Sequence, residues 1–126
     1  MLLKLDFSSD VPIYLQIRNQ VVMGIAEGKL SPGDKLPTIR SLANESGINV
    51  MTVNKAYALL KQEGYILADR RSGAIINPDR CKPGYISDKT KNDLKLVISE
   101  IKLAGVSREE LLHLCGQLYD EMEEIR

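Results

Sequence analysis

The sequence has few of the residues that disulfide frameworks, metal sites and membrane spans require. It contains two cysteines and one histidine in 126 residues, too few for a disulfide-stapled fold or for several converging metal ligands. No run of 18 or more apolar residues is present, which excludes a helix that spans a membrane. The first six residues lack the long apolar core of a secretory signal peptide. We therefore expect a cytoplasmic protein with no membrane partner, no metal site and no cofactor.

Motifs for catalysis are missing as well. The chain has no glycine-rich phosphate-binding loop, no nucleophile elbow and no triad of nucleophile, base and acid. The acidic pairs Glu109/Glu110 and Glu123/Glu124 fit a helix start and solvent-facing positions, and nothing pairs them as an acid–base couple. We therefore expect that the protein is not an enzyme.

Charge is balanced overall but not along the chain. Seventeen basic side chains equal seventeen acidic ones, so composition alone does not indicate a nucleic-acid-binding protein. Residues 35–80 hold seven basic and four acidic side chains, whereas residues 81–126 hold seven basic and nine acidic ones. A locally positive middle fits a surface that binds an anion, although runs of charge are usually only solvated faces.

The first helix is predicted from its start signal and its apolar spacing. Asp10-Val11-Pro12 is typical of a helix start, with a side-chain acceptor just before a proline near the first helical position. Apolar residues then recur at four-residue steps from Ile13 to Ile25, which predicts an amphipathic helix that ends near Gly28. Residues 30–37 are predicted to form a turn, because proline and glycine are frequent there.

Two shorter helices follow, separated by a tight turn. The first covers residues 38–46 and ends at Gly47. The second covers residues 49–63, with Asn49 as its cap and Gly64 at its end. Two helices joined by a short turn with glycine form a helix-turn-helix. The residues predicted on the inner face of the second helix are Val53, Ala56, Tyr57 and Leu60, and we expect Tyr14 and Tyr57 in the core.

A small β-hairpin completes this first region. Residues 65–68 and 74–77 are β-prone, and Asp69-Arg70-Arg71-Ser72-Gly73 between them forms a basic tip. Three helices followed by a hairpin are the plan of a winged helix-turn-helix. The predicted fold class is therefore mostly α with a small β-hairpin, and a short helical region follows it.

This arrangement suits DNA. The major groove of B-DNA accepts one α-helix, so the second helix of the pair can read base edges. Its outer face carries Asn54 and Lys55, which are suitable ligands for base edges or phosphates, while Asn49 and Thr52 lie near its N-terminus, where backbone N–H groups favour a phosphate. The Arg70-Arg71 tip could enter the minor groove or touch the backbone; alternatively, these charges only protect an exposed hairpin edge from aggregation.

Four stretches resemble a known family: PIYLQI at 12–17, GKLSPGDKLPTIRSLA at 28–43, TVNKAY at 52–57 and EGYI at 63–66. With them, residues 11–76 resemble the DNA-binding domain of the GntR superfamily, and the details resemble its YtrA subfamily. The resemblance implies a bacterial transcription regulator, usually a homodimeric repressor on a near-palindromic operator in double-stranded DNA. Members of this subfamily often control neighbouring ABC-transporter operons, and their short two-helix C-terminal part serves dimerisation.

The resemblance also implies DNA contacts, with two departures. It points to Arg40, to Asn49 and Thr52, to the outer face of the helix over 49–63 and to the turn around Gly73. Residues 49–52 read Asn-Val-Met-Thr where subfamily members commonly have Asn-Pro-Asn-Thr, so we hypothesise that Met51 contacts a thymine methyl group. The turn around Gly73 lacks the hydroxyl of the usual Gly-Thr-aromatic sequence. Because of both departures, the operator sequence of other family members cannot be transferred to this protein. The residues that we expect to contact DNA are Arg40, Asn49, Met51, Thr52, Asn54, Lys55, Arg70, Arg71, Ser72 and Gly73.

The last forty residues are predicted to form two helices. One runs from Ser87 to Ala104, and a capping box of Ser107 and Glu110 begins the other after the break at Gly105. So short a pair cannot build a large core, so its apolar faces must cover the first helix or the same region of a second subunit. We expect a homodimer whose interface includes Leu94, Val97, Ile98, Ile101, Leu111, Leu114, Leu118 and Met122.

The predicted organisation is a DNA-binding domain over residues 1–78, a linker over 79–86 and a dimerisation region over 87–126. Cys81 falls in the linker, and Cys115 lies on the apolar stripe as a small core residue. Winged helices also serve as protein–protein interaction modules, so that function class stays open. The sequence identifies neither a small-molecule effector nor a target gene.

Overall fold

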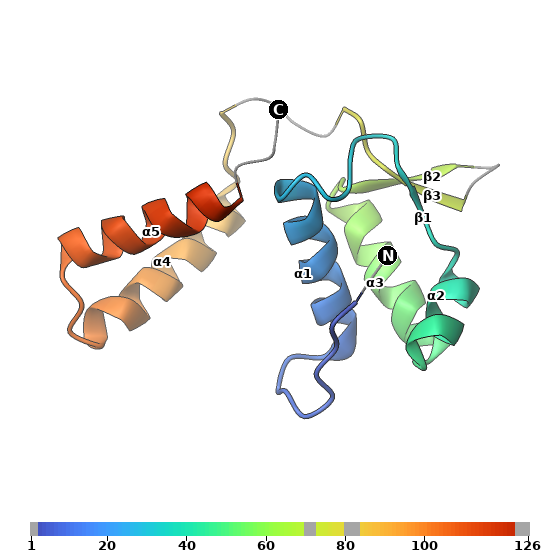
Figure 1. The fold of residues 1–126 in the computed structure, drawn as a ribbon, viewed down its shortest axis with the longest axis horizontal. Coiled ribbons are helices and arrows are strands. Elements are labelled where there is room, and N and C mark those ends of the chain that lie inside the picture. The colour runs from blue at the N-terminus through green and yellow to red at the C-terminus, as the bar shows by residue number, and fades with distance from the viewer. Residues whose placement is uncertain (1–2, 70–72, 80–83, 123–126) are drawn as a thin grey trace. The chain divides into compact units, whose positions relative to one another are not determined.

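The computed structural model describes residues 3–69, 73–79 and 84–122, which belong to two compact units (Figure 1). The first unit contains α1 (Ile13–Ala26), β1 (Lys35–Leu36), α2 (Ile39–Ser46), α3 (Val50–Gln62), β2 (Ile66–Asp69) and β3 (Gly73–Ile76). The second unit contains α4 (Asp88–Leu103) and α5 (Arg108–Glu121). The predicted fold class, mostly α with a winged helix-turn-helix, is confirmed.

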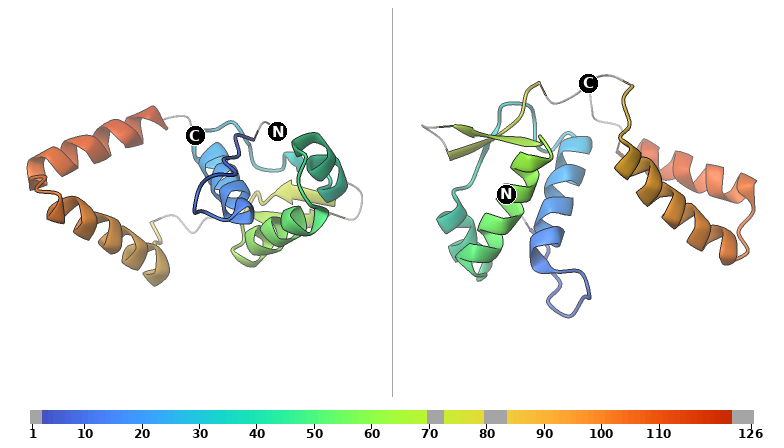
Figure 2. Two further views of the ribbon diagram at one scale, coloured as in Figure 1. Left: turned by 90° about the horizontal axis from the view of Figure 1, so that it is seen from below. Right: turned by 180° about the vertical axis from the view of Figure 1, so that it is seen from behind.

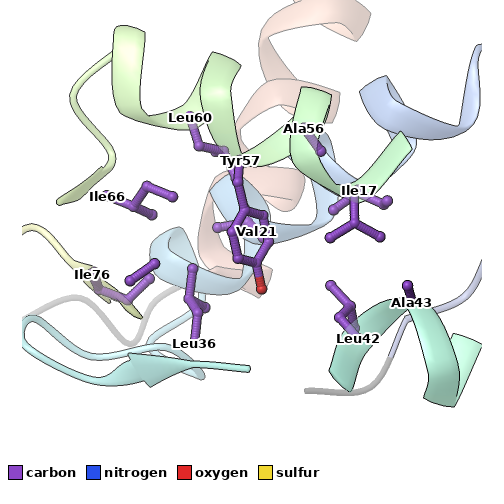
Figure 3. Close-up of a cluster of buried hydrophobic side chains, with 12 residues drawn as sticks. Ile17, Val21, Leu36, Leu42, Ala43, Ala56, Tyr57, Leu60, Ile66 and Ile76 are labelled. Carbon is purple, nitrogen blue, oxygen red and sulfur yellow. The ribbon is translucent and has the colours of Figure 1, made fainter. Parts of the chain in front are cut away.

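The core of the first unit lies between the three helices and the sheet (Figure 3). From α3 it takes the four residues predicted for the inner face, all of them buried. The other buried apolar residues are Ile17, Val21, Leu36, Leu42, Ala43, Ile66, Ala74 and Ile76. Because α3 packs against both α1 and α2, one of its faces is fixed in the core and the opposite face is left outside (Figures 1 and 2).

The sheet has three strands, not the two that the sequence predicts. Its antiparallel order is β1-β3-β2, and β1 lies in the segment predicted to be a turn. Leu36 of β1 pairs with Ala74 and is buried, so burial stabilises a strand only two residues long. Gly33 has a φ of 84°, and its N–H donates to the carbonyl of Ile76 at 2.9 Å. The predicted turn therefore leads directly into the sheet.

Helix ends follow their sequence signals with one exception. The Thr38 side chain accepts a hydrogen bond from the N–H three residues along α2, at 3.0 Å. Ser107 and Glu110 form the predicted capping box, whose hydrogen bonds from Ser107 lower the pKa of the Glu110 carboxyl. The exception is α1, whose cap residue is Pro12 and which has no side-chain cap. The prediction that the Asp10 side chain accepts a hydrogen bond at the start of this helix was wrong.

Two glutamines tie the N-terminal segment to α1. Gln16 accepts a hydrogen bond from the N–H of Asp6 at 2.8 Å and donates to the carbonyl of Asp6 at 2.9 Å. One turn along, Gln20 accepts from the N–H of Lys4 at 2.9 Å and donates to the Lys4 carbonyl. Each side-chain amide thus pairs with a backbone unit as a neighbouring strand would. This role could not be predicted, because a glutamine on an amphipathic helix carries no signal for it.

Tyr57 gives the core a pH dependence that can be measured. Its hydroxyl donates to the carbonyl of Pro37 at 2.7 Å, and burial raises the pKa of Tyr57 to about 12. In the unfolded chain the pKa of a tyrosine is about 10. Burial of the neutral Tyr57 side chain therefore contributes to the free energy of unfolding. We expect this contribution to be full below pH ~10 and to be lost as pH rises towards ~12, because the unfolded chain ionises first. In urea unfolding, Tyr57→Phe should cost about 1 kcal/mol at neutral pH and should lose less stability than the parent in this interval. Equal losses would contradict the assignment.

Candidate nucleic-acid interface

The turn between α2 and α3 sets the position of the predicted recognition helix. Gly47 ends α2 in the left-handed conformation, with a φ of 66°, and its N–H bonds to the carbonyl of Ala43. Asn49 then caps α3, because its side-chain oxygen accepts a hydrogen bond from the N–H of Met51 at 2.7 Å. The predicted cap is confirmed, and the Asn49 side chain serves the helix itself.

The outer face of α3 presents the predicted contact residues to solvent. Met51 is 70% exposed, and Asn54 and Lys55 are exposed beside it. Thr52 is half-buried. Arg40, in the first turn of α2, is exposed as well. The structure thus brings these residues to the surface of one helix pair, with a large exposed apolar side chain among polar ones.

The charges of this helix pair are mostly positive. α3 carries Lys55 and Lys61 and no acidic side chain. α2 carries Arg40 and one acid, Glu45, which accepts a hydrogen bond from the Ser41 hydroxyl at 3.3 Å. The positive electrostatic field of such a surface attracts an anion, and no carboxylate on α3 weakens that field.

The wing is described in part. β2 and β3 pair from Ile66 with Ile76 to Asp69 with Gly73. Gly73 is exposed at the start of β3. Three predicted contact residues, Arg70, Arg71 and Ser72, lie outside the described residues, and so does Cys81.

One contact beside the outer face of α3 was not predicted. The ammonium nitrogen of Lys55 lies over the ring of Tyr14, 4.1 Å from its centroid. Tyr14 lies in the first turn of α1, where it is half-buried and packs against the core. The prediction that it is a core residue is therefore correct for only part of its side chain. The spacing of apolar residues in the sequence cannot show that the ring of one of them faces a lysine on another helix.

An ion pair fixes α1 to the end of α3. Arg18 of α1 donates to both carboxylate oxygens of Glu63, through Nε at 2.8 Å and a terminal nitrogen at 3.1 Å. Its guanidinium also lies over the ring of Tyr65, 5.5 Å from the centroid. Bidentate pairs of this kind hold geometry better than single contacts do. This pair was not predicted, because its members are 45 residues apart and no local pattern links them.

The second unit exposes most of its apolar residues. None of the described residues of α4 or α5 is buried. Among the predicted interface residues, Ile101, Leu111 and Met122 are half-buried, and the exposed ones are Leu94, Val97, Ile98, Leu114 and Leu118. Cys115 is exposed in this chain, so its predicted place in a core was wrong for the single subunit.

Two kinds of feature are absent from the described residues. Within residues 3–69, 73–79 and 84–122, no helix is both long and apolar enough to cross a membrane. The same residues contain no cluster of three or more His, Cys, Asp or Glu side chains that could hold a metal ion.

Comparison with known proteins agrees with this geometry. The sequence profile described as "Bacterial regulatory proteins, gntR family" matches residues 13–76, half of the chain. The chain belongs to the GntR family. Over 113 residues it is 37% identical to the HTH-type transcriptional repressor YtrA of Bacillus subtilis, covering 87% of this chain and 86% of that protein. This GntR-family protein is therefore a DNA-binding transcriptional regulator of the YtrA subfamily and not an enzyme.

Solved structures extend the comparison. YtrA from Sulfolobus acidocaldarius, a GntR-family transcription factor, matches with a TM-score of 0.57 and 36% identity over 94% of this chain and 97% of that one. The AraR DNA-binding domain, solved in complex with operator ORX1, matches with a TM-score of 0.53 and 25% identity over 60% of this chain and 98% of that one.

Proposed function

We propose that this protein is a homodimeric repressor that binds a near-palindromic operator with α3 of each subunit in the major groove. The observation that carries the proposal is the two-sided character of α3. One face is locked into the core, and the other is exposed, carries amide, ammonium and thioether groups and has no carboxylate. A single helix fits the major groove, where amide and ammonium groups match base edges and phosphates.

Further contacts complete the proposed DNA interface. Arg40 reaches the DNA from α2. Thr52 and the side-chain NH2 group of Asn49, whose oxygen caps α3, bind a phosphate at the N-terminus of α3. The wing, with Arg70, Arg71, Ser72 and Gly73, contacts the backbone or the minor groove. The repressor role is supported by the name of the Bacillus relative. An ABC-transporter operon is the target favoured by resemblance to the YtrA subfamily.

Dimerisation accounts for the exposed apolar residues of the second unit. Two helices without a buried residue have no core of their own, and burial of their apolar side chains against a second copy is favourable. We infer that residues 87–126 form the dimer interface, that residues 1–78 bind DNA and that residues 79–86 link them. The two recognition helices would then meet half-sites about 34 Å apart, one turn of DNA.

The salt dependence of binding separates this proposal from a protein–protein interaction module. For a duplex enriched from a random pool, the logarithm of the affinity should fall linearly with the logarithm of salt concentration, by about 0.9 per neutralised phosphate. A winged helix that recruits a protein through its apolar residues would bind no such duplex, and its complex would respond weakly to salt. That result would contradict the proposal.

Met51 is expected to read a thymine methyl group. Its side chain is the most exposed of those on α3 that are large and apolar. Met51→Asn should replace the preference for thymine at one position of each half-site, because an amide instead matches adenine. The change should be worth about 1–3 kcal/mol of discrimination and is measured by repeating the duplex selection with the variant. An unchanged base preference would show that Met51 does not read that position.

A further inference from the structure

We propose that Tyr14 positions Lys55 for a phosphate of the bound DNA, so that the first turn of α1 takes part in DNA binding. The inference rests on the proposed function and adds a positioning residue that lies outside the helix-turn-helix. Tyr14 itself need not touch the DNA. Its role is to hold the ammonium group of its neighbour in one place.

The two residues share a groove of about 890 Å³ beside the outer face of α3. Pro12, Ile13 and Tyr14 of the α1 start form one wall. The other wall is the outer face of α3, including Met51, Asn54 and Lys55. The exposed face of α3 is thus bounded on one side by α1, and Lys55 lies at that boundary. A side chain at the edge of a recognition helix is placed for the sugar–phosphate backbone rather than for base edges.

The contact orders Lys55 without neutralising it. The ring face of a tyrosine attracts a cation, and the Nζ-to-centroid distance of 4.1 Å is within the range of a cation–π interaction. An ion pair with a carboxylate would order the lysine too, but it would cancel its charge. Neither α1 nor α3 contains an acidic residue, and none lines the groove. Glu63, directly after α3, is paired with Arg18.

This combination favours an anionic ligand. A lysine side chain loses about 2 kcal/mol of rotamer freedom when it is fixed, and a lysine already restrained loses less on binding. The ammonium keeps its full charge and its three N–H donors, so a phosphate oxygen can bind it while the ring stays on its other side.

Four single variants, and the double variant that combines Tyr14→Leu with Lys55→Gln, test the inference on a duplex enriched by the parent protein. Lys55→Gln should lower the salt slope by about 0.9 per subunit, or about 1.8 for a dimer, which converts to about 60-fold weaker binding at ~0.1 M salt. Tyr14→Leu should weaken binding by about two- to fivefold per subunit, the range of an exposed cation–π contact. Tyr14→Phe, which keeps the ring, should bind like the parent. Lys61→Gln removes the same charge from α3 outside the groove and should leave the slope unchanged.

The decisive result is the coupling between the two residues. Tyr14→Leu should cause no further loss in the Lys55→Gln background, whereas a merely structural tyrosine would weaken both backgrounds equally. Independent losses, or an unchanged slope in Lys55→Gln, would overturn the inference. A new base preference in Lys55→Gln with an unchanged slope would also overturn it. In these cases the proposed function stands as long as the parent binds its duplex and Arg40→Glu weakens that binding. If the parent enriches no duplex, the proposed function fails, and this inference fails with it.

Discussion

Replacing Leu114 and Leu118 together with glutamate should convert the proposed dimer into a monomer and lower operator affinity by at least about a hundredfold. Both leucines lie on α5, 42% and 47% exposed in the single chain, so their replacement disturbs no core. In the dimer each glutamate would have to be buried without a partner, which is unfavourable. The loss of affinity follows because linked heads bind two half-sites with an avidity about 10²–10⁴ greater than one head alone.

Light scattering measures the first part of this prediction and duplex titration the second. Leu103→Glu is the matched control, because Leu103 is 88% exposed and helical spacing places it on the face of α4 opposite the predicted interface residues. It should stay dimeric and bind like the parent. A parent protein that is monomeric at micromolar concentration, or a double variant that stays dimeric, would show that these leucines are not the interface.

Arg40→Glu should weaken operator binding by about a hundredfold or more at ~0.1 M salt. The exchange removes one cation per subunit from the protein surface that faces DNA and puts a carboxylate there, which the phosphates repel. The salt slope should fall by at least about 0.9 per subunit. Folding should be little affected, because Arg40 is exposed in the first turn of α2, where an acidic side chain interacts favourably with the helix dipole.

Arg108→Glu provides the control for this charge reversal. Arg108 is likewise an exposed arginine in the first turn of a helix, but it belongs to the second unit. The two variants therefore have the same net charge and differ only in where it has changed. Equal effects on affinity would mean that net charge, rather than a contact from α2, governs binding.

The helix-turn-helix could be predicted because its signals are local. Gly47 and Asn49 mark helix ends through bonds to residues no more than four positions away, and the structure has both in their predicted roles. Thr38, predicted only to lie at the start of a helix, caps α2. The buried face of α3 follows from spacing alone, since residues three and four apart share a helix face. The exposed residues that we propose to contact DNA follow in turn, because they occupy the opposite face.

Features that depend on distant partners could not be predicted. β1 exists because Leu36 meets Ala74, 38 positions along the chain, and no local pattern marks a two-residue strand. Tyr14 reads as a core residue, and only the packing of α1 on α3 places its ring beneath Lys55. Cys115 follows an apolar stripe that a single chain leaves exposed. In each case periodicity identifies an apolar face, but not the surface that covers it.

The most direct measurement is selection of bound duplexes from a random pool by the purified protein at about physiological salt. A dimer that presents two α3 helices should enrich an inverted repeat, with half-site centres about one helical turn, or ~34 Å, apart. Recovery of that repeat would also supply a sequence with which to find the regulated operon. Enrichment of a single asymmetric site, or of no sequence at all with and without cell extract as a source of effector, would contradict dimeric operator binding.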